Sequence, residues 1–185
     1  MSDYIYISLD EAYRLINHGP LLLISTCGED GRYDIAPIAW NCPVEKSPAR
    51  VLIVVGKGHQ TFKNIRDSKE FIACVPSSSQ YDMVRKTGSV SGRDHDKFTK
   101  YNIDYIEGNK VNAMVPVGCV GFIECNVDNI IEEEDVGIIV GEAVKAYADN
   151  RGFSDRVLPE NKEGETLHHL GGGIFGVLSE KIIDL

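Results

Sequence analysis

Residues 21–41, LLLISTCGEDGRYDIAPIAWN, contain two runs rich in apolar and β-branched residues, 21–27 and 32–41, on either side of Gly28-Glu29-Asp30-Gly31. Glycine and aspartate are typical of tight turns, so the pattern predicts two antiparallel strands joined as a hairpin. Pro37 lies in the second run and has no N–H to donate, which places that strand at a sheet edge or at a bulge. The sheet therefore begins antiparallel.

The rest of the chain continues with strands and only short helices. Further strands are predicted at 50–55, 70–75, 118–127, 140–148 and 173–178, and short helical stretches at 62–66, 80–86 and 96–101. A capping box beginning at Ser8 predicts one more helix before the hairpin. No long helix alternates regularly with the strands, so a parallel βαβ fold is disfavoured. We expect a mainly β, antiparallel barrel with short peripheral helices, formed as a single domain over residues 1–185.

Composition and charge exclude several classes of partner. The chain has 185 residues, with 28 Asp and Glu against 19 Lys and Arg, giving a net charge of −9. Its basic residues are scattered among acidic ones, so nucleic acid and anionic membrane surfaces are not expected partners. The five cysteines are odd in number and include no C-x-x-C pair, so we expect no metal site and mostly buried, reduced thiols. Without an export signal or a membrane-spanning apolar run, the expected compartment is the cytoplasm.

Residues 51–64, VLIVVGKGHQTFKN, run from a predicted buried strand through a glycine-containing loop into a helix start. This connection suits a phosphate monoester, because the glycines allow close backbone approach, Lys57 and Lys63 supply charge, and Thr61 supplies a hydroxyl. The same residues are consistent with an ordinary strand-to-helix connection in which Thr61 caps the helix and the lysines are solvated.

Two other segments carry residues suited to a planar or anionic ligand. In 34–41, DIAPIAWN, the proline leaves neighbouring backbone groups unpaired. Trp40 could pack along a heterocyclic ring, although a lone tryptophan in a strand is more often a core residue. In 88–98, GSVSGRDHDKF, small residues allow close approach and Lys97 could face developing negative charge. The second segment is also consistent with a solvated loop in which Asp94 or Asp96 caps the next helix.

A histidine pair, His168-His169, precedes three glycines near the C-terminus. Adjacent side chains on an extended chain point to opposite sides, so joint metal chelation by both is disfavoured. Either one histidine lines a site or both are exposed in a loop. The sequence contains neither G-x-S-x-G nor H-E-x-x-H.

Taken together and in this order, these segments resemble the flavin reductase-like family of FMN-binding split barrels, and within it the flavoredoxin branch. The likeness rests on residues 20–26 with 36–40, on residues 59–65, and on residues 90–98, where S-G-x-x-x-D-K-F looks like the family's hallmark loop. Later segments, 123–125, 141–144 and 169–173, agree with it.

The resemblance implies a bound FMN and a set of residues around it. The isoalloxazine ring would lie along Ala36, Pro37, Ile38, Ala39, Trp40 and Asn41. The phosphate would be held by Lys57, Gln60 and Thr61, with His59 on the same side and Lys63 or Asn64 nearby. Ser91, Gly92 and Lys97 would also belong to the cofactor site, and residues around the partner subunit's His169 and Phe175 would complete it. Lys97 and His169 are the implied catalytic residues. Lys97 would lie near the pyrimidine end of the ring, where positive charge stabilises the anionic reduced flavin.

Two positions depart from the family pattern. Many relatives have Asn where this chain has Asp34, and an anionic carboxylate there would oppose flavin reduction unless it is hydrogen-bonded or turned away. Many relatives also have a Cys-Gly pair where this chain has Thr87-Gly88, so no thiol-based redox role is expected there.

The resemblance also implies a homodimeric oxidoreductase. Electrons would pass from NADH or NADPH through FMN to an acceptor: free flavin, ferric iron or a redox protein. Two alternatives remain open on the sequence: a flavoredoxin-type FMN electron carrier that is reduced by a protein partner without NAD(P)H activity, and a barrel that has lost the flavin and serves as an interaction module.

Overall fold

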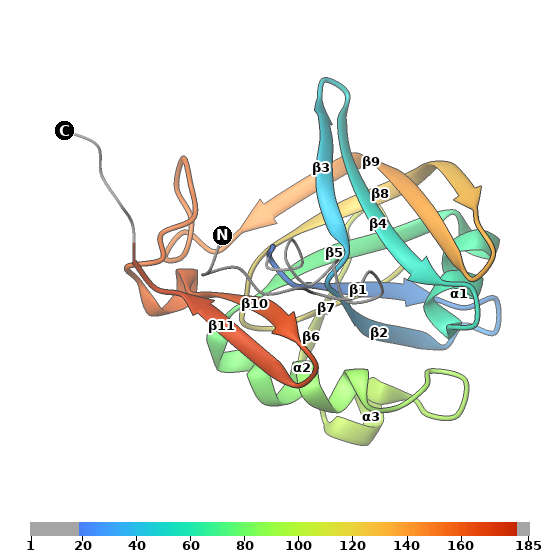
Figure 1. The fold of residues 1–185 in the computed structure, drawn as a ribbon, viewed down its shortest axis with the longest axis horizontal. Coiled ribbons are helices and arrows are strands. Elements are labelled where there is room, and N and C mark those ends of the chain that lie inside the picture. The colour runs from blue at the N-terminus through green and yellow to red at the C-terminus, as the bar shows by residue number, and fades with distance from the viewer. Residues whose placement is uncertain (1–18, 181–185) are drawn as a thin grey trace, which may run out of the picture.

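The structure is a computed structural model that describes residues 19–180, so the helix predicted from Ser8 lies outside the described residues. The main sheet contains seven strands: β1 (Leu22–Cys27), β2 (Tyr33–Ile38), β3 (Asn41–Lys46), β4 (Ala49–Gly56), β5 (Glu70–Pro76), β8 (Cys119–Glu132) and β9 (Val136–Ala148). Each is antiparallel to its neighbours in the order β2-β1-β5-β8-β9-β4-β3 (Figure 1). The predicted mainly β, antiparallel fold is confirmed.

The two edge strands of this sheet are consecutive in the chain. β2 ends at Ile38 and β3 begins at Asn41, so only Ala39 and Trp40 join the two edges. The sheet therefore has to curl into a barrel, and at the corner the Val54 N–H donates to the Trp40 carbonyl at 2.9 Å. The sequence predicts one strand that continues to Asn41; in the structure β2 ends at Ile38 because the chain turns the barrel corner, and β3 is not predicted by the sequence. The prediction that Pro37 lies on an edge strand is confirmed, since β2 pairs only with β1.

Strand β1 is buried along its whole length, and its side chains alternate between two hydrophobic clusters. Leu22 and Ile24 pack inside the barrel with residues of β4, β5, β9 and the first helix. Leu23 faces the other side of the sheet, where it packs in a cluster that includes Val84 and Phe98. This alternation explains why the run 21–27 contains no polar face: both sides of the strand are covered.

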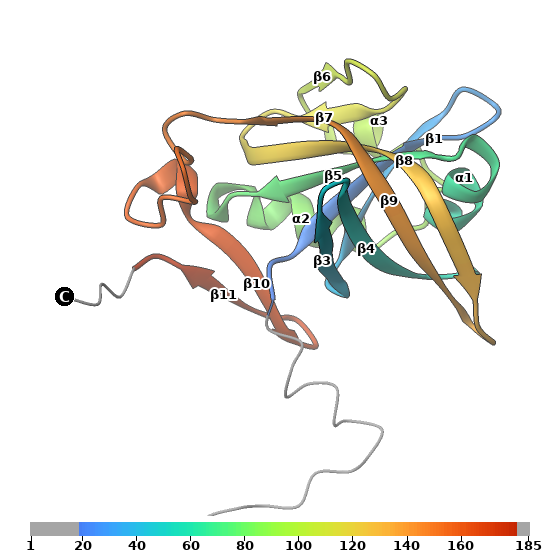
Figure 2. The same ribbon diagram turned by 90° about the horizontal axis from the view of Figure 1, so that it is seen from above.

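Short helices and two small hairpins surround the barrel. The helices are α1 (Gln60–Ser68), α2 (Tyr81–Gly88) and α3 (Lys97–Tyr101); the hairpins pair β6 (Tyr105–Glu107) with β7 (Met114–Pro116) and β10 (Thr166–Gly171) with β11 (Ile174–Leu178). Figures 1 and 2 show the β10–β11 hairpin on the opposite side of the molecule from α1. The predicted short peripheral helices are confirmed, whereas the sequence does not predict β6, β7 or β10.

A fully buried carboxylate fastens one loop to the barrel. Glu124 on β8 accepts the backbone N–H groups of Asn109, Lys110 and Val111 at 3.1, 2.5 and 2.8 Å. Three backbone donors on one carboxylate replace the water that burial removes, so Glu124 ties the loop between β6 and β7 to the barrel; Glu70 adds a further contact by accepting the Asn112 N–H at 3.2 Å.

The cysteines differ in their exposure. Cys27, Cys74 and Cys125 are buried, Cys119 is half-buried and Cys42 is exposed. Burial, with a smaller contribution from the charge of Glu124, raises the pKa of the Cys125 thiol to about 12. Cys125 is therefore protonated at neutral pH.

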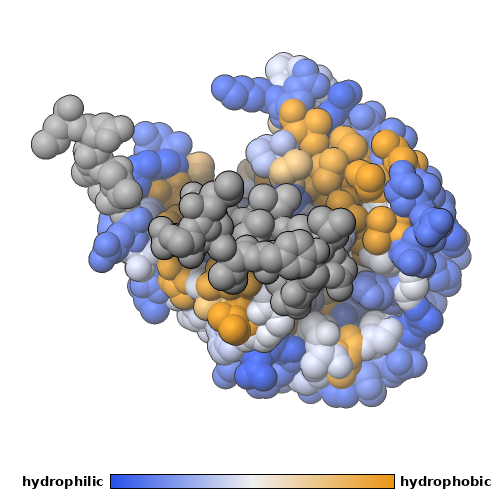
Figure 3. Space-filling model, in the orientation of Figure 1, coloured by the Kyte–Doolittle hydropathy of each residue, from blue (hydrophilic) through white to orange (hydrophobic). Residues whose placement is uncertain are grey.

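Large apolar side chains also reach the surface, among them Val44 on β3 and Ile174, Val177 and Leu178 on β11. Figure 3 shows apolar residues gathered on one face of the molecule, within a rim of polar ones. Within residues 19–180, no helix has the length and apolar character needed to cross a membrane.

Candidate functional site

A cleft of about 340 Å³, here called the main cleft, lies between edge strand β2, the start of α1 and the segment that follows α2. It brings together the three segments singled out in the sequence as binding candidates. Its lining residues are Asp34, Ala36, Pro37, Ile38, His59, Gln60, Thr61, Thr87, Gly88, Ser89, Val90, Ser91, Gly92 and Lys97.

The loop after α2 lies directly on strand β2 at two glycines. A Cβ atom at Gly88 would stand 2.8 Å from Pro37 Cγ, and one at Gly92 would stand 2.4 Å from Asp34 Oδ1. Both distances are well below van der Waals contact, so only glycine allows the loop to approach the strand this closely. These contacts define the width of the main cleft.

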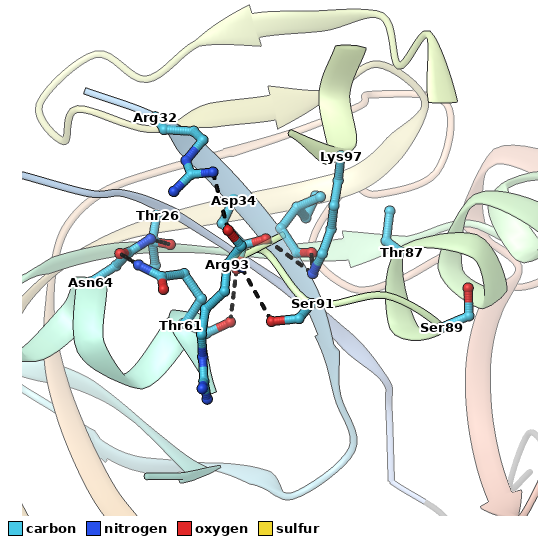
Figure 4. Close-up of polar contacts among 12 residues, drawn as sticks. Thr26, Arg32, Asp34, Thr61, Asn64, Thr87, Ser89, Ser91, Arg93 and Lys97 are labelled. Atoms are coloured by element: carbon cyan, nitrogen blue, oxygen red, sulfur yellow. Dashed lines mark hydrogen bonds and ion pairs between the residues drawn. The ribbon is translucent and has the colours of Figure 1, made fainter. Parts of the chain in front are cut away.

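A buried ion pair forms part of the cleft wall. Lys97 and Asp34 are 3 and 2% exposed, and Lys97 Nζ lies 3.0 Å from Asp34 Oδ1 (Figure 4). The same ammonium donates to the Ile35 carbonyl at 2.7 Å, and the Thr61 hydroxyl donates to Asp34 Oδ2 at 3.1 Å. Asp34 is therefore neither turned away nor free: it faces the cation that the resemblance places beside the ring.

Asp96 holds Lys97 in place through the backbone. It is the N-cap of α3 and accepts the Thr99 N–H at 3.1 Å, which confirms one of the two caps considered from the sequence. Burial opposes ionisation of this carboxyl, but hydrogen bonds from the Thr99 side chain and backbone and from the Phe98 backbone outweigh it and lower the pKa of Asp96. The cap is therefore ionised at neutral pH and fixes the first residue of α3, Lys97, toward the cleft.

The start of α1 presents backbone donors to the cleft. His59 is the N-cap and makes no side-chain bond to the helix, and the first backbone bond of the turn runs from Lys63 N–H to the His59 carbonyl at 3.4 Å. The N–H groups from Gln60 to Phe62 therefore precede the helical hydrogen bonds and, with the helix dipole, attract an anion. Thr61 does not cap the helix, because its hydroxyl proton is directed to Asp34.

The positive charge near this helix start does not come from Lys57. Its ammonium lies 3.6 Å from Glu132, and Lys57 does not line the main cleft. Arg93 takes the corresponding position: its Nη2 lies 3.9 Å from an ideal Cβ at Gly58, and it lines an adjoining polar cavity of about 260 Å³ that shares Gln60 with the main cleft. The sequence does not indicate a phosphate-binding role for Arg93, because its approach to Gly58 depends on the path of the intervening chain.

A second cavity of about 350 Å³, here called the side cavity, shares Pro37, Gly88 and Ser89 with the main cleft. Four residues of the β10–β11 hairpin contribute to its wall: His169, Gly172, Gly173 and Phe175. The ring centroids of His169 and Phe175 are 5.3 Å apart. One histidine of the pair thus lines a site, as one of the sequence interpretations holds. Ala39 also lines this cavity rather than the main cleft.

Besides Lys57, three expected site residues lie outside both the main cleft and the side cavity. Trp40 is 46% exposed at the barrel corner, and the Asn41 side chain donates to the Pro20 carbonyl at 2.9 Å. Asn64 is buried below the helix start, where it accepts from Gln60 at 2.7 Å and donates to Thr26 at 3.0 Å. These contacts give Asn41 and Asn64 structural roles: one braces the corner and the other positions Gln60.

Thr87 and Val90 line the main cleft without having been singled out as contacts. The Thr87 hydroxyl donates to the Met83 and Val84 carbonyls at 2.9 and 3.2 Å, so it is directed into its own helix. The glycine and serine content of residues 88–92 is the signal that locates this wall.

Comparison with known proteins agrees with this geometry. A family model described as "Flavin reductase like domain" matches residues 14–169. The protein YddH of Escherichia coli (strain K12) is 37% identical over 186 residues, covering 98% of each chain.

Solved structures with the same fold include an FMN-binding domain of a flavin reductases-like enzyme from Shewanella baltica OS155. It is 26% identical to this chain, with a TM-score of 0.80, and the match covers 96% of this chain and 95% of that one. Flavoredoxin of Desulfovibrio vulgaris (Miyazaki F) has 19% identity and a TM-score of 0.81 over 100% of this chain and 95% of its own.

Proposed function

Because the chain belongs to the flavin reductase-like family, we propose that it is an oxidoreductase that binds FMN in the main cleft and passes electrons from NADH or NADPH through it to an acceptor. The observation that carries this proposal is that an anion-attracting helix start and an edge strand line the same cleft. A phosphate-bearing planar cofactor needs both.

The residues present fit FMN. The main cleft and side cavity, about 340 and 350 Å³, are each in the size range of small-ligand sites and share one wall, which gives room for a tricyclic ring and its ribityl phosphate. The phosphate would accept from the first N–H groups of α1 and from Arg93, and the ring would lie along Ala36, Pro37 and Ile38. Lys97 donates one hydrogen bond, to the Ile35 carbonyl, and its contact with Asp34 Oδ1 is an ion pair without a hydrogen bond, so its ammonium can also donate to a ring oxygen.

FMN, when bound, supplies hydride acceptance and electron release. This chain's own residues would orient it and shield it from water. Gly88 and Gly92 allow the chain after α2 to lie close to β2. Phe175 packs edge-on against Tyr81, with ring centroids 5.4 Å apart, and this contact fixes the aromatic wall of the side cavity. A nicotinamide would reach the ring through this cavity, where His169 and Phe175 lie.

A second candidate is a carrier that takes electrons from a protein rather than from a nicotinamide. The observation that favours it lies on the β10–β11 hairpin beside the side cavity, where Leu170, Ile174 and Val177 are 47, 66 and 47% exposed. Exposed apolar side chains next to a cofactor site are suited to docking a redox partner.

An anaerobic visible spectrum of the protein reconstituted with FMN, recorded before and after stoichiometric NADH and then NADPH, separates the two. Rapid bleaching of bound flavin supports the reductase. A persistent flavin spectrum supports the carrier, and failure to bind FMN rejects both.

The phosphate site is tested with a matched pair of variants. Arg93→Gln should weaken FMN binding about tenfold, roughly 1.4 kcal/mol, because a charge-assisted hydrogen bond is lost, while riboflavin, which has no phosphate, should bind as to the wild type. Lys57→Gln should leave the FMN affinity unchanged because Lys57 pairs with Glu132. The reverse pattern, with Lys57→Gln weakening FMN and Arg93→Gln having no effect, would reject this phosphate assignment.

A further inference from the structure

We propose that Asp34 is a positioning residue that masks the charge of Lys97 and thereby lowers the midpoint potential of bound FMN. This inference rests on the proposed function, since it concerns a cofactor in the main cleft. Asp34 would cancel most of the stabilisation of reduced flavin that the resemblance implies for Lys97 as a free cation, and the contacts around the two side chains carry this inference.

The first step is the position of the ammonium. Lys97 Nζ is held by Asp34 Oδ1 at 3.0 Å and by the Ile35 carbonyl at 2.7 Å, both on strand β2. An ammonium has three N–H groups, and only the Ile35 carbonyl takes a hydrogen bond from it in the described residues, since the Asp34 contact is an ion pair. Lys97 can therefore donate a hydrogen bond to a ligand while its charge is compensated from behind.

The second step is the charge itself. Both side chains are almost completely buried, and a buried pair at this separation is far less screened by water than a surface pair. A reduced, anionic cofactor would therefore face the small dipole of an Asp–Lys pair instead of a full positive charge. Stabilisation of the reduced form relative to the oxidised form is correspondingly smaller.

The third step is that Asp34 is prevented from moving away. The Thr61 hydroxyl donates to Oδ2 at 3.1 Å (Figure 4). Gly92 lies against Oδ1 so closely that a Cβ there would be 2.4 Å away. Helix α1, strand β2 and the glycine loop thus hold the carboxylate from three directions. The masking of Lys97 is built into the resting site and does not depend on a side-chain rearrangement.

The test compares four proteins loaded with FMN: wild type, Asp34→Asn, Lys97→Met and the double variant. Dissociation constants for oxidised and reduced FMN are measured anaerobically, and the midpoint potential by equilibration with a reference dye. Asp34→Asn should raise the ratio of the oxidised to the reduced constant at least tenfold, about 30 mV for a two-electron couple. Lys97→Met should lower the ratio, because it leaves the buried carboxylate uncompensated, and the double variant should lie within threefold of the wild type.

Asp94→Asn provides the matched control. Asp94 is exposed in the same loop, so its substitution removes the same charge without touching Lys97, and the ratio should not change. An unchanged or lowered ratio in Asp34→Asn, or an equal rise in Asp94→Asn, would overturn the proposal.

The double variant also protects the test against misfolding, because replacing a buried ion pair with uncharged groups is often tolerated. If neither single variant folds, a tenfold fall of the ratio in the double variant shows that Lys97 acts with its full charge and overturns the proposal, whereas a wild-type ratio supports it. Failure of the proposed function can be told apart from failure of this inference, because the wild-type protein would then bind no FMN.

Discussion

Replacing Gly92 with alanine tests the geometry of the main cleft most directly. The added Cβ would stand 2.4 Å from Asp34 Oδ1 and 2.5 Å from its Cγ, where ordinary contact requires about 3.4 Å or more. Either the loop or the carboxylate must therefore move by about 1 Å. Because Asp34 is fixed by Lys97 and Thr61, the loop cannot remain in place without breaking a buried ion pair.

The size of the effect follows from this conflict. Overpacking of a buried site costs about 1–3 kcal/mol. With a urea m-value of about 2 kcal/mol/M, a loss of about 2 kcal/mol moves the unfolding midpoint down by about 1 M. A displaced loop also widens the cleft, so FMN affinity should fall about tenfold or more, roughly 1.4 kcal/mol.

Two measurements check the prediction: urea unfolding followed by far-UV circular dichroism, and FMN titration followed by quenching of flavin fluorescence. Gly19→Ala is the control, because a Cβ at Gly19 meets no atom of residues 19–180 within 4 Å. If Gly92→Ala unfolds at the wild-type urea concentration and binds FMN with the wild-type constant, the reasoning that places this loop against Asp34 is refuted.

Three further predictions concern features outside the cofactor contacts. Asp96→Ala should destabilise the protein by about 0.5–2 kcal/mol at pH 7, because the N-cap acceptor is lost. The pKa of Asp96 is lowered in the folded protein, so the stabilisation that comes from its charge is complete above the ordinary value of 3.8 and disappears as the pH falls through the lowered value; the difference in urea unfolding between the two proteins should therefore shrink in acid, and a constant difference would contradict this. Native protein treated with a thiol reagent at pH 8 should be labelled first at exposed Cys42 and not at Cys125, whose pKa is about 12, and mass spectrometry showing early labelling of Cys125 would disprove its burial. Glu124→Gln should lower the melting temperature by several degrees, because an amide nitrogen replaces an oxygen that accepts a backbone N–H. Each lost hydrogen bond to a charged group costs about 1.5–3 kcal/mol. An unchanged melting temperature would show that the loop is held by other contacts.

The sequence predicts the strands that consist mainly of apolar residues. It does not predict strands in which polar residues interrupt the apolar ones. The buried run 21–27 and the proline in the next run predict a central strand beside an edge strand, and both are confirmed. Strand β10 escapes prediction because Thr166 and two histidines interrupt its apolar residues, although Thr166 and Leu167 are buried. The corner at 39–40 is equally hidden, because Ala and Trp are compatible with a continuous strand.

The candidate site likewise has features that the sequence predicts and features that it does not. Local composition identifies the segments that meet in the main cleft, since glycine-containing loops and helix starts are visible in a sequence. Which charges meet across the cleft is not visible, because Asp34 and Lys97 come from different elements and their pairing depends on how α3 packs on β2. The same holds for Lys57, whose partner Glu132 comes from the far end of β8.

The order of strands also decides when, during folding, the cleft can exist. Every residue that lines the main cleft lies between Asp34 and Lys97, so the first part of the chain contains all of them. The barrel that holds them, however, is completed by β8 and β9, which come later and insert between β5 and β4. The β4–β9 pairing joins Arg50 to Glu142, and closing so long a loop is slow compared with forming a hairpin. A chain emerging from the ribosome therefore carries the complete set of cleft residues long before it has a cleft, and it can capture a cofactor only after its second half has been made and folded.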